Sequence, residues 1–318
     1  MSMNRIKLLW VLMFLAGLLC SCQKEIEVKL PEYQNKLVVE GIIESGDYAR
    51  VVITRSVPYF SEIDLTVLLN DVLVSDAVVT VTTEDGLSEQ LSFEYSEDSP
   101  IYFAYVGKQI KGEYGKKYTL TIDADGKHYE AKTSIPQPFD LDSIWFAFSE
   151  TNPQDTTPTI RVLMTDNPLE NNYYRFFVKV HGQRLSDRLW VSTVPMVFDD
   201  RTFNGKTLNY EVLRANVSTL FAPAMSDEEL SEFYRLTYRP GDTVLIKHTT
   251  IDEESYKFWL SASSEITFGQ NPFMNPTPIV SGIKGENVMG VWSGYASKID
   301  TLIYPKDSKY IVSLQKCK

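Results

Sequence analysis

The sequence predicts a mainly β protein with two antiparallel β-sandwich-like domains, the second of which also carries two short helices. Three observations lead to this fold class. Many short segments alternate apolar and polar residues with a period of two, the pattern of a half-buried strand. Turn-forming residues such as Gly, Asp, Asn and Ser separate these segments. Pro136 and Pro138 favour an extended connector that divides the strand-rich chain into two parts.

The chain begins with a short basic region, Arg5 and Lys7, followed by an apolar run from Leu8 to Leu19. As a helix this run would be about 18 Å long. That length is well short of the roughly 30 Å hydrocarbon core of a bilayer. The pattern therefore predicts a signal peptide that is removed after export.

The segment from Leu19 to Cys22 resembles the bacterial lipobox, in which an aliphatic residue stands three positions before a cysteine and a small residue directly precedes it. Cys22 meets both requirements, whereas the bulky Leu19 precedes Cys20. The resemblance implies a lipoprotein signal peptide over residues 1–21 and lipidation of Cys22. Acyl chains such as palmitate contribute about 0.8 kcal/mol per buried CH₂, so they would hold the chain on a membrane. An ordinary secretory signal containing two cysteines is the alternative.

Residues 22–35 are polar, contain Pro31 and are interpreted as a tether. Gln23 is not the aspartate associated with inner-membrane retention, which implies delivery to the outer membrane. The segment from Gln23 to Glu27 also resembles the surface-export signal of Bacteroidota lipoproteins, although Ile26 interrupts its acidic pair. We therefore expect a lipid-anchored protein that faces the cell exterior, and a merely soluble tether is the alternative.

Removal of residues 1–21 from the 318-residue chain leaves 297 residues, enough for two domains. It also removes two positive charges, which changes the formal net charge from −11 to −13. Such an acidic chain argues against nucleic acid as a partner. Only Cys22 and Cys317 remain, so no disulfide within the chain is expected once Cys22 carries lipid, and Cys317 is interpreted as a free thiol.

The first domain is predicted to span residues 36–135 as a sandwich that is immunoglobulin-like or similar to carboxypeptidase regulatory domains. Asp123 and Asp125 lie in the turn of its clearest hairpin, and they lack the further oxygen ligands of a calcium loop. We interpret them as turn residues. The predicted strands are Lys36–Ile43, Tyr48–Arg55, Ala77–Thr83 and the two arms of the hairpin Tyr118–Thr133.

The second domain, β-rich and spanning residues 139–318, has two helix start signals. Ser226 begins a capping box, and the acidic residues from Asp252 to Glu254 favour the start of a helix that runs to about Ser263. The predicted strands are Ser143–Ser149, Thr159–Thr165, Tyr173–His181, Thr301–Tyr304 and Tyr310–Leu314. Between the second helix and the last two strands lies a long stretch rich in proline and glycine, residues 269–296.

Five features together resemble the Bacteroidota lipoprotein family designated domain of unknown function 4249. They are the lipobox, a first strand reading LVVEGII, the Tyr118 hairpin that closes in a proline pair, Asn271-Pro272-Phe273, and the segment GVWSGY from Gly290 to Tyr295. The resemblance covers nearly the whole mature chain. The family has no established catalytic residues to transfer. Its members are often encoded beside TonB-dependent outer-membrane transporters, which implies an accessory role.

No catalytic, cofactor-binding or metal-binding residue is predicted. Gly285 and Gly290 have P-loop spacing, but Val291 and Trp292 replace the required lysine and hydroxyl residue. The three histidines belong to no zinc motif, and His248 is expected in the core or at a strand edge. Trp292 and Tyr295 form a tentative stacking platform for a sugar or peptide, although buried anchoring is the reading that the residue types favour.

We therefore expect an outer-membrane, surface-exposed lipoprotein that is not an enzyme and has no cofactor. It would act as an accessory or ligand-capturing partner of a TonB-dependent transporter, with membrane lipid, through acylated Cys22, as its other partner. Two alternatives remain open at this point. One is a surface hydrolase whose active site matches no motif, and the other is a structural or adhesive module.

Overall fold

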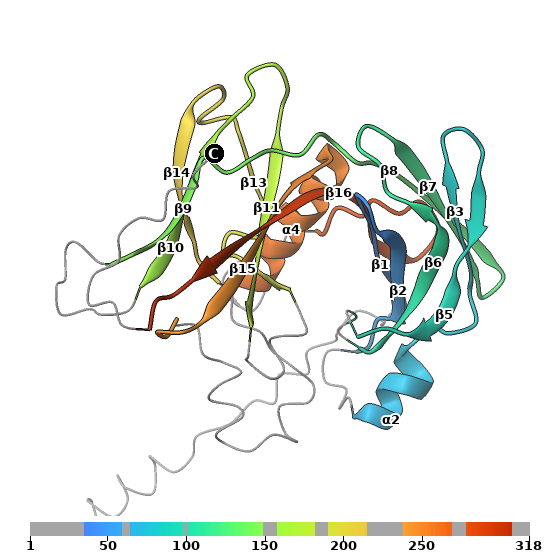
Figure 1. The fold of residues 1–318 in the computed structure, drawn as a ribbon. Helices are drawn as coiled ribbons and strands as arrows, with labels where there is room; N and C mark the ends of the chain where they lie inside the picture. The colour runs from blue at the N-terminus through green and yellow to red at the C-terminus, as the bar shows by residue number, and fades with distance from the viewer. Residues whose placement is uncertain are drawn as a thin grey trace, which may run out of the picture. The chain divides into compact units, whose positions relative to one another are not determined.

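The computed structural model describes residues 35–58, 64–97, 99, 101–148, 158–181, 190–214, 238–268 and 278–306 (Figure 1). These residues belong to one compact unit that begins at Asn35. The described chain is mainly β, with several antiparallel sheets, as the sequence predicts. Several expectations lie outside the described residues: the signal peptide, Cys22, nearly all of the tether, the helix after Ser226, Asn271–Phe273, the strand Tyr310–Leu314 and Cys317.

A nine-stranded sheet forms the centre of the described unit. Its neighbouring strands are antiparallel except β1 and β16, which run parallel from the pair Leu37 and Val288 to the pair Glu44 and Tyr295. A short strand, β13 (Phe198–Asp199), pairs with β11 beside the main order. That order is β12 (Val191–Ser192), β11 (Tyr173–His181), β15 (Thr243–Ile251), β16 (Val288–Ile303), β1 (Leu37–Glu44), β2 (Tyr48–Arg55), β6 (Phe103–Lys111) and β5 (Ser92–Tyr95).

Two smaller sheets and three helical segments complete the described elements. One small sheet has the order β4 (Ser88–Gln90), β3 (Val78–Thr83), β7 (Lys117–Ala124) and β8 (Lys127–Ser134). The other has the order β14 (Thr207–Val212), β10 (Thr159–Thr165) and β9 (Ser143–Ala147). The helical segments are α2 (Leu65–Val67), η1 (Leu68–Val72) and α4 (Glu253–Phe268). No helix among the described residues has the length and apolar character needed to cross a bilayer.

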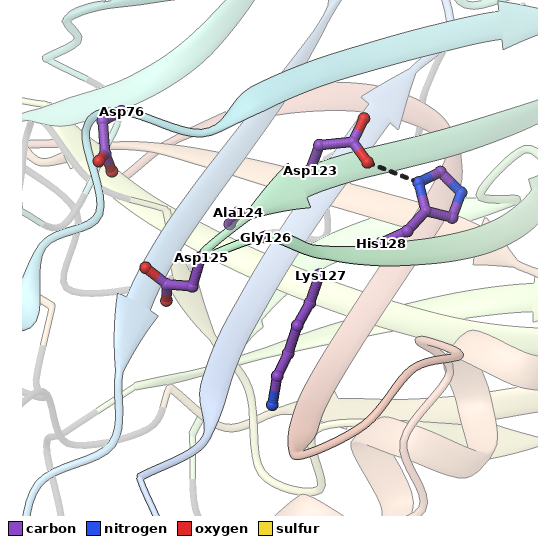
Figure 2. A pocket seen from close by; sticks show the side chains of 7 residues that line it. All are labelled: Asp76, Asp123, Ala124, Asp125, Gly126, Lys127 and His128. Atoms are coloured by element: carbon purple, nitrogen blue, oxygen red, sulfur yellow. Dashed lines mark hydrogen bonds and ion pairs between the residues drawn. The ribbon is translucent and has the colours of Figure 1, made fainter.

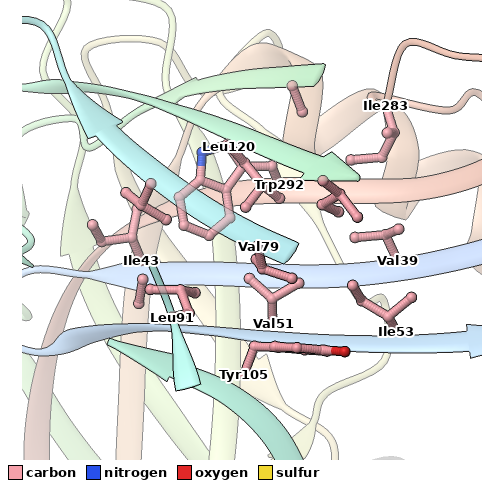
Figure 3. Close-up of a cluster of buried hydrophobic side chains, with 14 of the residues drawn as sticks. Val39, Ile43, Val51, Ile53, Val79, Leu91, Tyr105, Leu120, Ile283 and Trp292 are labelled. Carbon is pink, nitrogen blue, oxygen red and sulfur yellow. The ribbon is translucent and has the colours of Figure 1, made fainter. Parts of the chain in front are cut away.

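Both small sheets pack on the same face of the nine-stranded sheet, which we call the first face. Strand side chains alternate between faces, and on β16 the even-numbered Trp292 and Leu302 belong to the two main hydrophobic clusters. The cluster around Trp292 lies between β1, β2 and the β4-β3-β7-β8 sheet (Figure 3). The cluster around Leu302 joins β11, β15 and the β14-β10-β9 sheet. Helix α4 packs on the opposite, second face, where Tyr256 lies in a third cluster with Tyr295.

Strands from both sides of the Pro136 and Pro138 pair share the nine-stranded sheet. The first cluster also takes Ile283, Trp292 and Ala296 from the far side of that pair. The predicted division into residues 36–135 and 139–318 stays a prediction, but the structure joins the two parts through one continuous sheet.

The glycine-rich stretch contains the first part of β16, the longest strand described, and the sequence did not predict a strand there. β16 begins at Val288, whereas the expected strand began only at Thr301. The reason is that the glycines provide close approach rather than turns. A Cβ atom at Gly290 would lie 2.0 Å from the carbonyl oxygen of Val39, and one at Gly294 would lie 2.3 Å from that of Ser134.

Helix α4 begins where the acidic residues predict and ends later than expected, at Phe268 instead of about Ser263. Asp252 caps the helix, since one carboxylate oxygen accepts the backbone N–H of Ser255 at 2.8 Å. The serines that suggested an end are accommodated inside the helix. The Ser264 hydroxyl, for example, donates to the carbonyl oxygen of Leu260 at 3.0 Å.

Candidate functional site

An open hollow of about 440 Å³ lies at the hairpin turn that the sequence singled out (Figure 2). Asp123 contacts Nδ1 of His128 at 2.7 Å, while Asp125 forms an ion pair with Arg55 that lowers the pKa of the Asp125 carboxyl group. The two carboxylates point away from each other in Figure 2. Within the described ranges no three His, Cys, Asp or Glu side chains gather as metal ligands. The interpretation as turn residues therefore agrees with the geometry.

The second face of the nine-stranded sheet carries a different kind of cluster, built around Arg175. Alternation along β11 places Tyr174 and Phe176 in the first-face core and turns Arg175 and Phe177 to the other side. There α4 covers the arginine, which is only 3% exposed. Its guanidinium carbon lies 3.9 Å from the ring centroid of Trp259 and 4.7 Å from that of Phe177. These are cation–π contacts.

The guanidinium group of Arg175 is poorly satisfied for a buried charge. One terminal nitrogen donates to the hydroxyl of Tyr295, and Nε is buried without a hydrogen-bond partner. No carboxylate of the described residues lies within ion-pair distance of it. Buried charges in proteins are normally paired, because an unpaired charge in a low-dielectric interior is costly. Arg175 therefore calls for an explanation beyond folding.

A second buried cation, Lys247 on β15, lies on the same face and is paired. Its ammonium nitrogen is 3.1 Å from a carboxylate oxygen of Glu44 on β1, and it also lies 4.9 Å from the ring centroid of Trp190. Burial lowers the pKa of Lys247, and the pairing with Glu44 opposes that shift. The positive charge of Lys247 thus already has a partner, unlike that of Arg175.

Glu40 on β1 faces the same cluster and combines two properties. Its side chain is exposed to solvent. Burial among surrounding protein atoms nonetheless raises the pKa of its carboxyl group, while the positive charges of Arg175 and Arg50 oppose this rise. Water reaches this carboxylate within crowded surroundings.

Trp292 and Tyr295, the tentative stacking platform, are both buried and do not form an exposed surface. They are three positions apart on one strand and therefore point to opposite faces. Trp292 packs in the first-face core and donates its indole N–H to the carbonyl oxygen of Tyr118 at 3.2 Å. Tyr295 lies on the second face at Arg175. The prediction of an exposed stacking platform is therefore corrected: both residues are buried anchors, which is the alternative that the residue types favoured. Tyr295 nevertheless belongs to the candidate site.

The histidines do not form a site together. His248 is buried, its Nε2 lies 3.1 Å from a carboxylate oxygen of Asp300, and its ring packs against Phe139 at 4.7 Å between centroids. The expectation of a core histidine is confirmed. His128 and His181 are exposed and lie on β8 and β11, apart from it.

Sequence reasoning missed Arg175, Lys247 and Trp259. The available signal was the strand YYRFFVKVH, residues 173–181, where cations occupy the odd positions between aromatic residues. That pattern normally indicates a solvated face, and only the packing of α4 shows that this face is covered.

The sequence model of one protein family, described as a domain of unknown function (DUF4249), matches residues 23–300. All residues of the second-face cluster fall inside this range. No curated protein matches the chain significantly.

Proposed function

The chain belongs to the family of domain of unknown function 4249, and from this premise we propose that it is an outer-membrane lipoprotein of a Bacteroidota cell. It faces the cell exterior and captures a ligand for a TonB-dependent transporter. Anchoring, orientation and ligand capture have separate support and are taken in turn.

The lipobox that ends in Cys22 supports the anchor. The match to the family begins at residue 23, directly after this cysteine. Multiple acyl chains on Cys22 would bury enough CH₂ groups for stable attachment to a bilayer. Gln23 and the charged residues that follow support the outer membrane and its outward face.

The observation that carries ligand capture is the buried and unpaired guanidinium of Arg175. A structural arginine at this depth would be expected to have a carboxylate partner, and none of the described residues provides one. Functional sites retain arrangements of this kind at a cost in stability because the missing partner arrives with the ligand. The aromatic rings around Arg175 would fix its orientation before binding.

Cell fractionation of Cys22→Ala tests the anchor, with Cys20→Ala as the matched control. The parent chain and Cys20→Ala should sediment with the outer membrane and should incorporate labelled palmitate. Cys22→Ala should do neither. Outer-membrane sedimentation of Cys22→Ala with undiminished label would contradict the assignment.

Protease treatment of whole cells tests orientation. Complete resistance of the chain, in cells where a surface control protein is digested, would exclude the outward face.

Affinity purification from membranes in mild detergent tests the partner. A tagged full chain should recover a TonB-dependent transporter, and the control is a tagged lipoprotein of another family at the same expression level. Repeated recovery of the chain without any outer-membrane transporter would contradict this part of the proposal.

A further inference from the structure

We propose that the second-face cluster binds a small organic anion and that Arg175 pairs with a carboxylate of that ligand. The inference rests on the ligand capture proposed above and names the class of ligand. It is carried by four observations on the described residues: the free donors of Arg175, the aromatic frame, further unpaired donors, and the distribution of charge.

The first observation is the unused capacity of the guanidinium group. Arginine has five N–H donors in a planar fork that matches the two oxygens of a carboxylate. In this structure one terminal nitrogen of Arg175 donates to Tyr295, and this is its only hydrogen bond to a described residue. A carboxylate of a ligand would supply both the missing acceptors and a negative charge within ion-pair distance.

The second observation is the rigidity of the frame. Trp259 of α4 lies over one side of the guanidinium at 3.9 Å, and the rings of Phe177 and Tyr295 lie at 4.7 Å and 5.8 Å. A planar cation between aromatic rings has few orientations available, so its fork is set before the ligand arrives. The rings also provide apolar contact for the carbon skeleton of an organic anion, which a simple inorganic ion could not use.

Further unpaired donors lie on the same side of the sheet. The Ser293 hydroxyl is fully buried without a hydrogen-bond partner, and Ser293 precedes Tyr295 by two residues on the same face of β16. The indole N–H of Trp259 also lacks a partner. Buried donors are nearly always satisfied in native proteins. These two unsatisfied donors on the face that carries Arg175 indicate a place for an acceptor-rich group.

The distribution of charge favours a carboxylate over a phosphate. Lys247 is paired with Glu44, whereas Arg175 has no carboxylate of the described residues within ion-pair distance, although the charge of Glu40 acts on it. Arg50 on β2 and Glu40 on β1 are the other charged groups that act on the cluster, and Glu40 repels any anion. Each carboxylate group carries one negative charge and so matches the single guanidinium, whereas one phosphate group carries about −1.5 to −2 at neutral pH. Because Glu40 is reached by solvent, we place the entrance on the β1 side.

Calorimetric titration of the full chain with sodium succinate tests the inference. Sodium chloride at equal ionic strength controls for general salt effects, and sodium phosphate tests the other oxyanion. Saturable binding of succinate that sodium chloride does not reproduce is the expected result. Binding no stronger than that of chloride, or a preference for phosphate, would overturn the assignment of a carboxylate site.

Variants locate the site and separate binding from folding. Arg175→Met should lower succinate affinity by roughly tenfold or more, since it removes a bidentate charge-assisted pair. Its melting temperature should equal or exceed that of the parent, because an unpaired buried charge is replaced by an apolar side chain. A large drop in melting temperature would instead identify a structural arginine and overturn the proposal. Arg161→Met is the matched control, because Arg161 pairs with Glu211 at 3.1 Å on the β14-β10-β9 sheet, and its affinity should not change.

Glu40→Gln provides an independent arm because it removes the charge of Glu40 and nearly keeps the size of the side chain. The loss of a repelling carboxylate should tighten succinate binding severalfold, and unchanged affinity would place the anion elsewhere. The outcomes also separate this inference from the proposed partnership. If the chain binds succinate through Arg175 but recovers no transporter, the anion site is supported and the transporter partnership is contradicted. If the chain recovers a transporter but binds no succinate, the partnership is supported and the anion site is contradicted.

Discussion

Asp252 joins three elements that are far apart in the sequence, and its replacement by alanine gives the sharpest test of how α4 is held. One carboxylate oxygen accepts the N–H of Ser255 at the start of α4. The other accepts the backbone N–H of Ser134 at 3.1 Å and the hydroxyl of Thr133, both on β8. The Thr133 hydroxyl in turn accepts the N–H of Gly294 on β16 at 2.7 Å.

The expected cost of Asp252→Ala follows from these bonds. Loss of a helix N-cap costs about 1 kcal/mol. The Ser134 N–H and the Thr133 hydroxyl lose their acceptor in a partly buried place, and each buried unsatisfied group costs about 1 to 3 kcal/mol. Since these groups are not fully enclosed, we take the lower part of that range and expect a total loss of about 3 to 4 kcal/mol in the free energy of unfolding.

Urea unfolding followed by circular dichroism measures this loss. Asp252→Asn is the matched control, because the amide oxygen still accepts one of the bonds, and it should cost less than Asp252→Ala. A double-mutant cycle with Thr133→Val should give a coupling energy of at least about 0.5 kcal/mol. A loss below about 0.5 kcal/mol for Asp252→Ala, or strict additivity with Thr133→Val, would refute the reasoning. Succinate affinity should also fall in Asp252→Ala, because α4 carries Trp259.

Three further predictions concern single residues. The raised pKa of Glu40 means that protonation of its carboxyl group stabilises the fold at acid pH, and this contribution is lost as the pH rises through the raised value. Glu40→Gln should therefore raise the melting temperature near pH 8 and leave it unchanged near pH 4. Equal effects at both pH values would contradict the shift. Gly294→Ala should destabilise the fold by about 2 kcal/mol or more in urea unfolding, since the added Cβ atom meets backbone atoms and not a movable side chain. Gly46→Ala is the control. It has open space around the added Cβ atom and should show only the smaller cost of its left-handed backbone. Glu89→Gln should cost about 1 to 3 kcal/mol by the same measurement, because the buried carboxylate accepts the backbone N–H groups of residues 108, 109 and 110. The control is Glu94→Gln at a half-buried position, and a loss indistinguishable from that of this control would contradict the role of Glu89.

Local signals were sufficient for the strands that pair with a sequence neighbour. The hairpin from Tyr118 to Thr133 became β7 and β8, because its alternation and its Asp-Gly turn depend on residues within reach of each other. The strands Lys36–Ile43 and Tyr48–Arg55 became β1 and β2 for the same reason. The parallel pairing of β1 with β16 was not predictable in this way, because it joins residues about 250 positions apart and no turn specifies its register.

The second-face cluster was hidden by a similar limit. The sequence indicated the apolar side of β11 correctly, with Tyr174, Phe176, Val178 and Val180 in the core. The other side of β11 carries Arg175 and Lys179, and alternating polar residues normally indicate a face of the sheet that is exposed to solvent. Burial of Arg175 depends on α4. The start of this helix is signalled by nearby residues, but its position over β11 depends on tertiary packing and cannot be read from the local sequence.

The segment GVWSGY, one of the five features that carry the family resemblance, has a physical explanation for four of its residues. Gly290 and Gly294 allow the backbones of β1 and β8 to approach β16 where any Cβ atom would collide with a carbonyl oxygen. Trp292 fills the first-face core, and Tyr295 holds Arg175 on the second face. Because alternation has a period of two, a shift of one residue would send the tryptophan to the second face and the tyrosine to the first. The spacing of these four residues therefore fixes the register of the parallel pair and, through it, the place of the tyrosine hydroxyl at the candidate anion site.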